Sequence, residues 1–269
     1  MPLTEEDIAS GTYLDRASIL LGGDDDVKTA VKPFALIVLN QPVTDLDMLD
    51  RVWSNAAVKI CADGGTNRLY GALDESTRAK YKPDFIAGDL DSLRPEIRKY
   101  YETELGVPVY YSPDQDSTDF GKCLLKLGEL YPGERFPVVA LGGTGGRVDQ
   151  EFHSIHTLFV HERGEDEEDT NVRSDKKQRE ITLLSDDSLT FLAGPGTQTI
   201  HTPRTVLGPT CGIIPVAGPT VISTKGFTWD VSDWATSLGT QVSTSNALEA
   251  DAVVIKSDKT VLFTLEIRR

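Results

Sequence analysis

Cysteine is scarce in this chain and carries no pairing pattern. The three cysteines, Cys61, Cys123 and Cys211, are scattered and form no C-x-x-C pair, which is typical of reduced thiols in a cytosolic protein. Asn-x-Ser/Thr glycosylation sites are absent. The acidic opening MPLTEEDIAS has neither the basic region nor the apolar region of a signal peptide. We therefore expect a cytoplasmic protein.

Basic residues and long apolar runs are also in short supply. No run approaches the roughly 18 consecutive apolar residues of a membrane span, although apolar residues make up 39% of the chain, enough for a core. The 27 basic and 42 acidic residues give a net charge of −15. This argues against nucleic acid or an anionic membrane as a partner. A phosphorylated small ligand remains possible because a bound divalent cation can reverse the local sign, and an acidic surface could favour a cationic substrate.

The pattern of the chain changes twice along its length. Residues 1–32 look like a loosely ordered arm. In residues 33–180 short apolar runs alternate with amphipathic segments, which predicts a Rossmann-like α/β domain with a mostly parallel sheet, flanking helices and an exposed charged insertion at 162–180. Residues 181–269 contain short β-rich runs broken by turn residues, which predicts a β-sandwich. Between the last two runs, SDKT (257–260) predicts a hairpin turn.

Polar loops follow directly on four of the predicted strands. They are ADGGTNR (62–68), GDLDS (88–92), SPDQDSTDF (112–120) and LGGTGGRVDQ (141–150). In an open parallel sheet the carboxyl ends of the strands lie at one edge, where ligands bind. We therefore expect one crevice to collect the charged side chains of these loops: Asp63, Asp89, Asp91, Asp114, Asp116, Asp119, Arg147 and Asp149.

So many carboxylates at one edge predict a metal ion. Crowded carboxylates repel one another unless a cation holds them, and Mg²⁺ usually combines one or two carboxylates with substrate phosphates. Each motif alone is ambiguous. The D-x-D pair of Asp89 and Asp91 is common in solvated loops, and Asp116 or Ser117 could cap the next helix. Together at one sheet edge, the two motifs favour a metal site.

The glycine-rich loop GGTGGR (142–147) resembles a phosphate cradle, because glycines let backbone N–H groups approach oxygens. Arg147 adds a forked donor suited to phosphate. The loop is neither a Walker A sequence nor G-x-G-x-x-G, and a tight strand-to-helix turn explains its glycines equally well. In the first loop Asp63 could accept a hydrogen bond from a hydroxyl, whereas Asn67 and Arg68 could be ordinary residues of a first helical turn.

The histidines and tryptophans indicate less. His153, His156 and His161 lie on one predicted helix without the H-E-x-x-H spacing, which predicts packing, and no Ser/His/Asp triad can be argued. Trp229 and Trp234 lie in a loop-like part of the β region. An exposed tryptophan can stack on an aromatic cation, but a tryptophan in a sandwich core is at least as common.

A series of segments, taken in order, resembles the eukaryotic thiamine pyrophosphokinase family. The segments are CADGGTNRLY (61–70), PDFIAGDLDSLRPEIRKYY (83–101), SPDQDSTDFGKCL (112–124), LGGTGGRVDQ (141–150), CGIIPV (211–216), GFTW (226–229) and GTQVSTSN (239–246). The resemblance runs from about residue 34 to the C-terminus. It implies an α/β nucleotide-binding domain, a β-sandwich, a homodimer with thiamine bound between subunits, and transfer of the pyrophosphoryl group of ATP to thiamine, giving thiamine diphosphate and AMP.

The resemblance also implies roles for individual residues. The Mg²⁺-binding aspartates are Asp89, Asp91 and Asp119, and Gln115 and Asp116 in the same loop are second choices. The nucleotide side comprises Asp63, Gly64, Gly65, Asn67, Arg68, Gly143 and Thr144. Arg147 and Asp149 face the phosphates and the reacting hydroxyl. Trp229, Ser245 and Asn246 lie near the thiamine pocket, with the Trp229 ring against thiamine; Trp234 has no assigned role.

The mechanism implied is an in-line attack of the thiamine hydroxyl on the β-phosphorus, with AMP leaving. Mg²⁺, Arg147 and glycine amides would neutralise the phosphate charge, and Asp149 or Asp119 could accept the hydroxyl proton. Two alternatives stay open. One is a haloacid-dehalogenase-like phosphatase with a nucleophilic aspartate in GDLDS, and the other is a nucleotide- or thiamine-binding sensor without catalytic activity.

Overall fold

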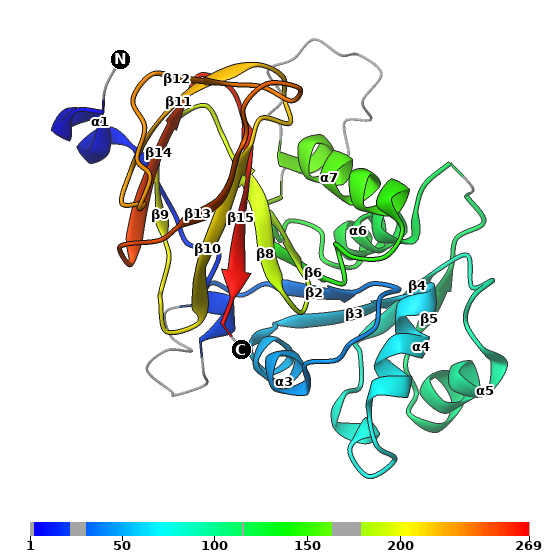
Figure 1. Cartoon of the computed structure of the whole chain (residues 1–269). Helices are drawn as coiled ribbons and strands as arrows, with labels where there is room; N and C mark the ends of the chain where they lie inside the picture. The colour runs from blue at the N-terminus through cyan, green and yellow to red at the C-terminus, as the bar shows by residue number, and fades with distance from the viewer. Residues whose placement is uncertain (1–2, 22–30, 115, 163–178, 269) are drawn as a thin grey trace. The chain divides into compact units, whose positions relative to one another are not determined.

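The computed structural model describes residues 3–21, 31–114, 116–162 and 179–268 (Figure 1). No helix in these ranges is both long enough and apolar enough to cross a membrane. The mixed α/β fold class with a β-rich C-terminal part, predicted from the sequence, is confirmed.

Contacts divide the chain into two compact units. Residues 22–186 form one, here called the α/β unit. Residues 1–21 and 187–269 form the other, here called the β-rich unit.

The α/β unit is built on six parallel strands. They are β2 (Ala35–Val38), β3 (Val58–Ala62), β4 (Phe85–Gly88), β5 (Val109–Tyr111), β6 (Val138–Leu141) and β7 (Ile181–Leu184), in the order β7-β6-β2-β3-β4-β5. Strands β2, β4, β6 and β7 are buried throughout, as expected for short apolar runs covered on both faces. The chain proceeds from β2 toward β5 and then returns to the other side of β2. The carboxyl ends of the neighbouring strands β2 and β6 therefore mark the switch point at which such sheets bind ligands.

Helices cover both faces of this sheet: α6 and α7 lie on one side, and α3, α4 and α5 on the other (Figure 1). Their bounds are α3 (Leu46–Asn55), α4 (Asp63–Ala72), α5 (Pro95–Arg98), α6 (Asp119–Leu130) and α7 (Val148–Glu162); a π-helical stretch, Lys99–Glu104, continues α5. Helix α4 begins at Asp63, four residues before the predicted start at Asn67. This places Asp63 at the helix N-terminus, directly after β3.

Helix α3 was not predicted from the sequence. Asp45 caps it, because one carboxylate oxygen accepts the Met48 N–H at 2.8 Å. Its buried face consists of Met48, Leu49, Val52 and Trp53, which repeat at helical spacing. The cap and the apolar period were both present in the sequence.

The β-rich unit contains two sheets. One has the order β1-β9-β14-β11-β12, formed by β1 (Thr12–Leu14), β9 (Gly196–His201), β14 (Ala252–Ser257), β11 (Thr220–Lys225) and β12 (Trp234–Thr236). In the other, four strands of this unit have the order β13-β10-β15-β8, formed by β13 (Ser243–Ala247), β10 (Leu207–Ile214), β15 (Val261–Ile267) and β8 (Ser188–Ala193). The centroids of the Phe227 and Phe263 rings are 6.1 Å apart, so the segment that follows β11 packs against β15 of the other sheet.

The N-terminal segment differs from the loose arm that the sequence predicted. It forms helix α1 (Glu5–Ser10) and strand β1, which pairs in parallel with β9. Lys256 Nζ lies 2.8 Å from an Asp7 carboxylate oxygen, and Leu20 is buried. A strand of three residues leaves no alternation to recognise in a sequence, so pairing with an existing sheet edge decides its conformation.

Two further expectations are corrected. Residues 181–185 (ITLLS) fall in the range predicted as a β-sandwich, but β7, which they form, pairs in parallel with β6. A short apolar run fits a buried parallel strand equally well. SDKT is not a hairpin turn: it connects β14 and β15, which lie in different sheets. Its Asp258 carboxylate accepts the Val221 N–H at 2.9 Å and the Thr220 hydroxyl. Most of the expected charged insertion, residues 163–178, lies outside the described residues.

Candidate active site

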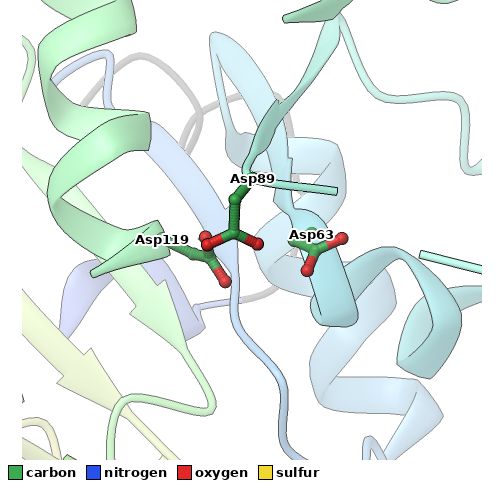
Figure 2. Close-up of side chains that lie close together, drawn as sticks. All are labelled: Asp63, Asp89 and Asp119. Atoms are coloured by element: carbon green, nitrogen blue, oxygen red, sulfur yellow. The ribbon is translucent and has the colours of Figure 1, made fainter. Parts of the chain in front are cut away.

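Three aspartates meet at the carboxyl edge of the α/β sheet. Asp63 opens α4, Asp89 follows β4, and Asp119 opens α6. Figure 2 shows their carboxylates turned toward one another. One oxygen from each lies within 4.8 Å of the others, so these residues, here called the acidic cluster, could hold a metal ion. Parallel strands bring them together although they are far apart in sequence.

Asp63 is the most deeply buried member of the cluster. Its exposed fraction is zero, and burial, reinforced by the charges of Asp119, Asp89 and Asp91, raises its pKa to about 6. The Ser92 N–H donates to Asp63 Oδ2 at 3.0 Å and opposes this shift. Oδ1 is buried without a hydrogen-bond partner among the described residues. A buried carboxylate oxygen in this state is a suitable ligand for a cation.

Lys122 also belongs to this site, although the sequence analysis did not single it out. Its Nζ lies 2.7 Å from Asp89 Oδ2 and 3.5 Å from Asp119 Oδ1. The ammonium lowers the pKa of Asp89, whereas burial and the charge of Asp89 raise that of Asp119. Because Asp119 and Lys122 are three residues apart on α6, they share one helix face, and this spacing was a usable signal.

Asp91 lies outside the acidic cluster. It is exposed, and its carboxylate accepts the Ser92 hydroxyl at 2.9 Å. Leu90 between the two aspartates has φ +61°, in the left-handed region that a leucine rarely adopts. This turn separates Asp91 from Asp89. Of the aspartates predicted to bind metal, the structure thus brings Asp89 and Asp119 together, with Asp63 in place of Asp91.

The other acidic loop is exposed. The Asp116 N–H donates to Asp114 Oδ1 at 2.9 Å, and the Ser117 hydroxyl donates to the same carboxylate at 2.7 Å. Thr118, rather than Ser117 or Asp116, caps α6. Gln115 lies outside the described residues.

Gly88 makes the close approach of the cluster possible. A Cβ at this position would lie 2.6 Å from Asp63 Cβ and 3.0 Å from Asp119 Oδ1. Any other residue would push these two side chains aside. The glycine of FIAGD therefore serves the geometry of the site.

The glycine-rich loop wraps around Gln41, a residue that the sequence analysis did not single out. A Cβ at Gly146, which has φ +84°, would lie 2.6 Å from Gln41 Nε2. The Gly143 N–H donates to the Ala140 carbonyl at 3.2 Å, so sheet backbone already engages this amide. The Gly145 N–H instead points to Glu151 Oε1 at 2.7 Å. Thr144 is half-buried between them. The amide of Gly145, rather than that of Gly143, therefore donates to an anionic group, the Glu151 carboxylate.

Arg147 and Asp149 form an exposed, forked ion pair. Arg147 Nε lies 3.1 Å from Asp149 Oδ1 and Nη2 lies 2.5 Å from Oδ2, which lowers the pKa of Asp149. Arg147 lines a cavity of about 240 Å³ that also reaches Asp119, Gln41 and Gly145. The cavity lies at the β2/β6 switch point, beside the acidic cluster.

The glycines of ADGG pack α4 against the strand beside it. A Cβ at Gly65 would lie 2.1 Å from the Val38 carbonyl oxygen, and one at Gly64 would lie 2.4 Å from Asn40 Nδ2. The same Asn40 accepts the Arg68 Nε–H at 2.8 Å. These two glycines therefore allow α4 to pack closely against the end of β2 and the residues after it, and they do not line an open ligand site.

Asn67 bridges α4 and the loop that follows β4. Its Nδ2 donates to the Ser92 carbonyl at 2.7 Å, and its Oδ1 accepts the Arg94 N–H at 3.1 Å. A cavity of about 670 Å³ lies alongside, lined by Asn40, Asn67, Arg68, Ser92 and Arg94, among others. Its two arginines give this part of the α/β unit a positive lining.

The residues expected near thiamine lie in the β-rich unit. Trp229 is 61% exposed, and Asn246 is buried beneath its turn. Ser245 has φ +58°, a second left-handed residue at a predicted site. Trp234 Nε1 donates to Gln241 Oε1 at 3.1 Å. Trp229 and Asn246 lie together, since they exchange hydrogen bonds, and Trp229 presents an uncovered aromatic ring.

These features define the class of protein. An acidic cluster, an arginine and a glycine-rich turn meet at the switch point of a parallel sheet, where phosphorylated ligands bind. The class is that of α/β proteins that bind phosphorylated ligands at the carboxyl edge of a parallel sheet.

Comparisons with known proteins identify the family. Residues 49–167 match the family model "Thiamin pyrophosphokinase, catalytic domain", and residues 197–262 match "Thiamin pyrophosphokinase, vitamin B1 binding domain". Thiamine pyrophosphokinase 1 of Oryza sativa subsp. japonica is 36% identical, over 91% of this chain and 90% of the relative. The Saccharomyces cerevisiae thiamine pyrophosphokinase is 29% identical, over 86% of this chain and 85% of the relative. The crystal structure of the yeast thiamin pyrophosphokinase superposes with a TM-score of 0.80 at 27% identity, covering 96% of this chain and 91% of that chain.

The chain belongs to the thiamine pyrophosphokinase family. The activity of this family is the transfer of the pyrophosphoryl group of ATP to thiamine, and the chain is an enzyme of this kind. Family membership sets aside the phosphatase and the non-catalytic sensor.

Proposed function

We propose that pyrophosphoryl transfer takes place at the carboxyl edge of the α/β sheet, with Mg²⁺ held by Asp63, Asp89 and Asp119. One observation carries this proposal: three carboxylate oxygens lie within 4.8 Å of one another, beside a buried Asp63 Oδ1 that has no partner among the described residues. Hard carboxylate oxygens are the ligands that Mg²⁺ prefers. When bound, Mg²⁺ neutralises charge on the triphosphate.

Asp91 has a supporting role in this proposal. Its carboxylate is exposed and only two residues from Asp89, so it extends the negative charge of the cluster toward the solvent side. We assign it to the outer side of the metal site, as an additional ligand once ATP is present. Asp116, which is exposed on the neighbouring loop, is assigned to the same solvent side.

Arg147 is proposed to hold the phosphate oxygens. A guanidinium has five N–H donors, and the Asp149 carboxylate accepts hydrogen bonds from two nitrogens of Arg147, Nε and Nη2. The remaining donors can reach phosphate while Asp149 fixes the plane of the fork. We therefore assign Asp149 to orienting Arg147, in preference to accepting the hydroxyl proton, because the pairing that lowers its pKa makes it a weaker base. The Gly145 N–H, which donates to Glu151 Oε1 at 2.7 Å, would become a further donor to the same oxygens once phosphate replaces that carboxylate.

The nucleotide is proposed to lie toward the cavity of about 670 Å³ that Asn67 and Arg68 line. A positive lining suits the α-phosphate side of ATP, from which AMP leaves. Gly64 and Gly65 contribute by seating α4, and Gly143 and Thr144 by shaping the loop across the sheet edge.

Thiamine is proposed to bind against the Trp229 ring in the β-rich unit. The ring is 61% exposed, and an aromatic face attracts an aromatic cation. A ring that the described residues leave largely exposed fits a site completed by a second copy, which supports a homodimer with thiamine between subunits. Ser245 and Asn246 would shape the turn that carries the ring. The free, buried thiols of Cys61, Cys123 and Cys211 fit a cytoplasmic enzyme.

The test is a product assay with ATP, Mg²⁺ and thiamine, following AMP and thiamine diphosphate by chromatography. The wild type should form both products in equal amounts. Asp89→Asn should lose at least about 100-fold in kcat/KM, and Asp91→Asn should lose less. Asp74→Asn, an exposed carboxylate after α4, is the matched control and should retain activity. If the wild type releases ADP or inorganic phosphate but no AMP, the proposal is wrong.

A further inference from the structure

Lys122 is a buried lysine inside the acidic cluster. Its side chain is only 2% exposed, and its Nζ is 2.7 Å from Asp89 Oδ2 and 3.5 Å from Asp119 Oδ1. A lysine is rarely buried unless a charge pairs with it. Asp89 supplies this charge, yet an exposed lysine on the same helix could have paired at the surface without the cost of burial. The position of Lys122 therefore calls for a role in the site.

The charge of the cluster suggests what this role is. Asp63, Asp89 and Asp119 carry three negative charges when ionised, and one ammonium reduces the sum from −3 to −2. A single divalent cation then brings the cluster to neutrality. The lysine also fixes directions, because it engages one oxygen of Asp89 and approaches one oxygen of Asp119.

We propose that Lys122 is a positioning residue that matches the acidic cluster to a divalent cation. This inference rests on the proposed metal site. The ammonium holds Asp89 and Asp119 in their places before metal binds. Its positive charge lowers the affinity of the site for every cation, and it lowers the affinity for a trivalent cation more than that for a divalent one. Asp119 and Lys122 both lie on α6, so the helix carries a ligand and its counter-charge as one rigid element.

Removing this charge has a calculable direction. Lys122→Met removes the ammonium and leaves an unbranched side chain one atom shorter, so every cation gains attraction in proportion to its own charge. A unit charge about 4 Å away changes affinity by roughly fivefold per unit of cation charge even in water. The preference for La³⁺ over Mg²⁺ should therefore rise by at least about fivefold. Lys122→Arg keeps the charge and should leave the preference unchanged.

The experiment is calorimetric titration of the nucleotide-free full chain with MgCl₂ and with LaCl₃. Asp89→Asn gives the binding that does not depend on the cluster, and its signal is subtracted. Lys126→Met is the matched control, because Lys126 lies one turn further along α6 and pairs with Glu129 at 2.5 Å. It should show the wild-type ratio of affinities. Lys122→Met should show the raised ratio, together with a lower kcat that Lys122→Arg restores.

Three outcomes overturn the inference, and a second variant covers a failure of Lys122→Met to fold. If a folded Lys122→Met binds La³⁺ and Mg²⁺ with the wild-type ratio, the lysine does not set the charge of the site. If Lys122→Arg shifts the ratio as Met does, charge is not the cause. Should Lys122→Met fail to fold, Lys122→Gln, which retains a donor toward Asp89, gives the same comparison. If the wild type binds neither cation at the cluster, the metal site itself is wrong, and the inference fails with it.

Discussion

Asn246 and Trp229 exchange two hydrogen bonds. Asn246 Oδ1 accepts the Trp229 N–H at 3.2 Å, and Asn246 Nδ2 donates to the Trp229 carbonyl at 3.1 Å. The buried amide thus acts as a backbone partner for the turn that presents the exposed ring. Asn246 Oδ1 also accepts the Ala247 N–H at 2.8 Å.

Asn246→Ala should release the Trp229 turn. Three hydrogen bonds disappear, which should lower the free energy of unfolding by about 1–3 kcal/mol. The KM for thiamine should rise about tenfold, while the KM for ATP, whose proposed site is in the α/β unit, should stay within about twofold. Steady-state kinetics with each substrate varied in turn measures both. Thr244→Ala, at an exposed position of the same strand, is the control. Equal changes in both KM values would contradict the assignment.

Gly88→Ala should damage the acidic cluster without removing a ligand. The new methyl group would lie 2.6 Å from Asp63 Cβ and 3.0 Å from Asp119 Oδ1, so both aspartates must move. We expect kcat/KM to fall by about 100-fold and stability by about 1–3 kcal/mol. Gly128→Ala, in the interior of α6, meets only ordinary contact at 3.8 Å from Arg179 Nη2. It should keep full activity and gain about 0.5–1 kcal/mol. An active Gly88→Ala enzyme would show that the cluster geometry is not needed.

Asp63→Asn should stabilise the metal-free protein while abolishing activity. Because the pKa of Asp63 is raised from 3.8 to about 6, the folded state holds more protons than the unfolded state between these values. Wild-type stability should therefore fall as the pH rises from about 4 to 6. In EDTA at pH 7 the variant should be about 1–3 kcal/mol more stable by urea denaturation, and the difference should vanish near pH 4. Mg²⁺ should restore stability to the wild type alone. A pH-independent difference would refute this account of Asp63.

The N-terminal segment should detach from the β-rich unit in acid. Lys256, followed by the Thr4 cap, lowers the pKa of Asp7 from 3.8 to about 2. The stabilisation from this pairing is thus complete above about pH 4 and is lost as the pH falls through about 2. Asp7→Asn should have the same effect at pH 7, seen as faster amide exchange in β1. Glu6→Gln, in the same helical turn, is the control. Unchanged protection of β1 in Asp7→Asn would mean that the ion pair does not hold this segment.

Much of the site could be predicted because apolar runs and polar loops alternate regularly. Strands β3 and β4 end where the sequence indicates, so Asp63 and Asp89 reach one sheet edge. The sequence could not predict that Asp63 belongs to the acidic cluster and that Asp91 lies outside it. This difference depends on the φ of +61° at Leu90, and a D-x-D pattern carries no information about this angle.

Lys122 and Gln41 were missed for a different reason. In a sequence, a lysine on an amphipathic helix is expected at the surface, and only packing against the sheet shows that it is buried. Gln41 follows β2, and its place inside the glycine-rich loop depends on strands β2 and β6 lying side by side. The burial of Lys122 and the place of Gln41 arise from tertiary contacts, although the i, i+3 spacing of Asp119 and Lys122 is visible in the sequence.

The proposed active site holds one ion among aspartates of three separate elements. Crystals grown with Mn²⁺ and a non-hydrolysable ATP analogue test this claim through anomalous difference density. We expect a manganese peak bonded to carboxylate oxygens of Asp63, Asp89 and Asp119, next to the triphosphate. A peak at another place in the chain, or ordered nucleotide beside a cluster that holds no ion, would contradict the claim.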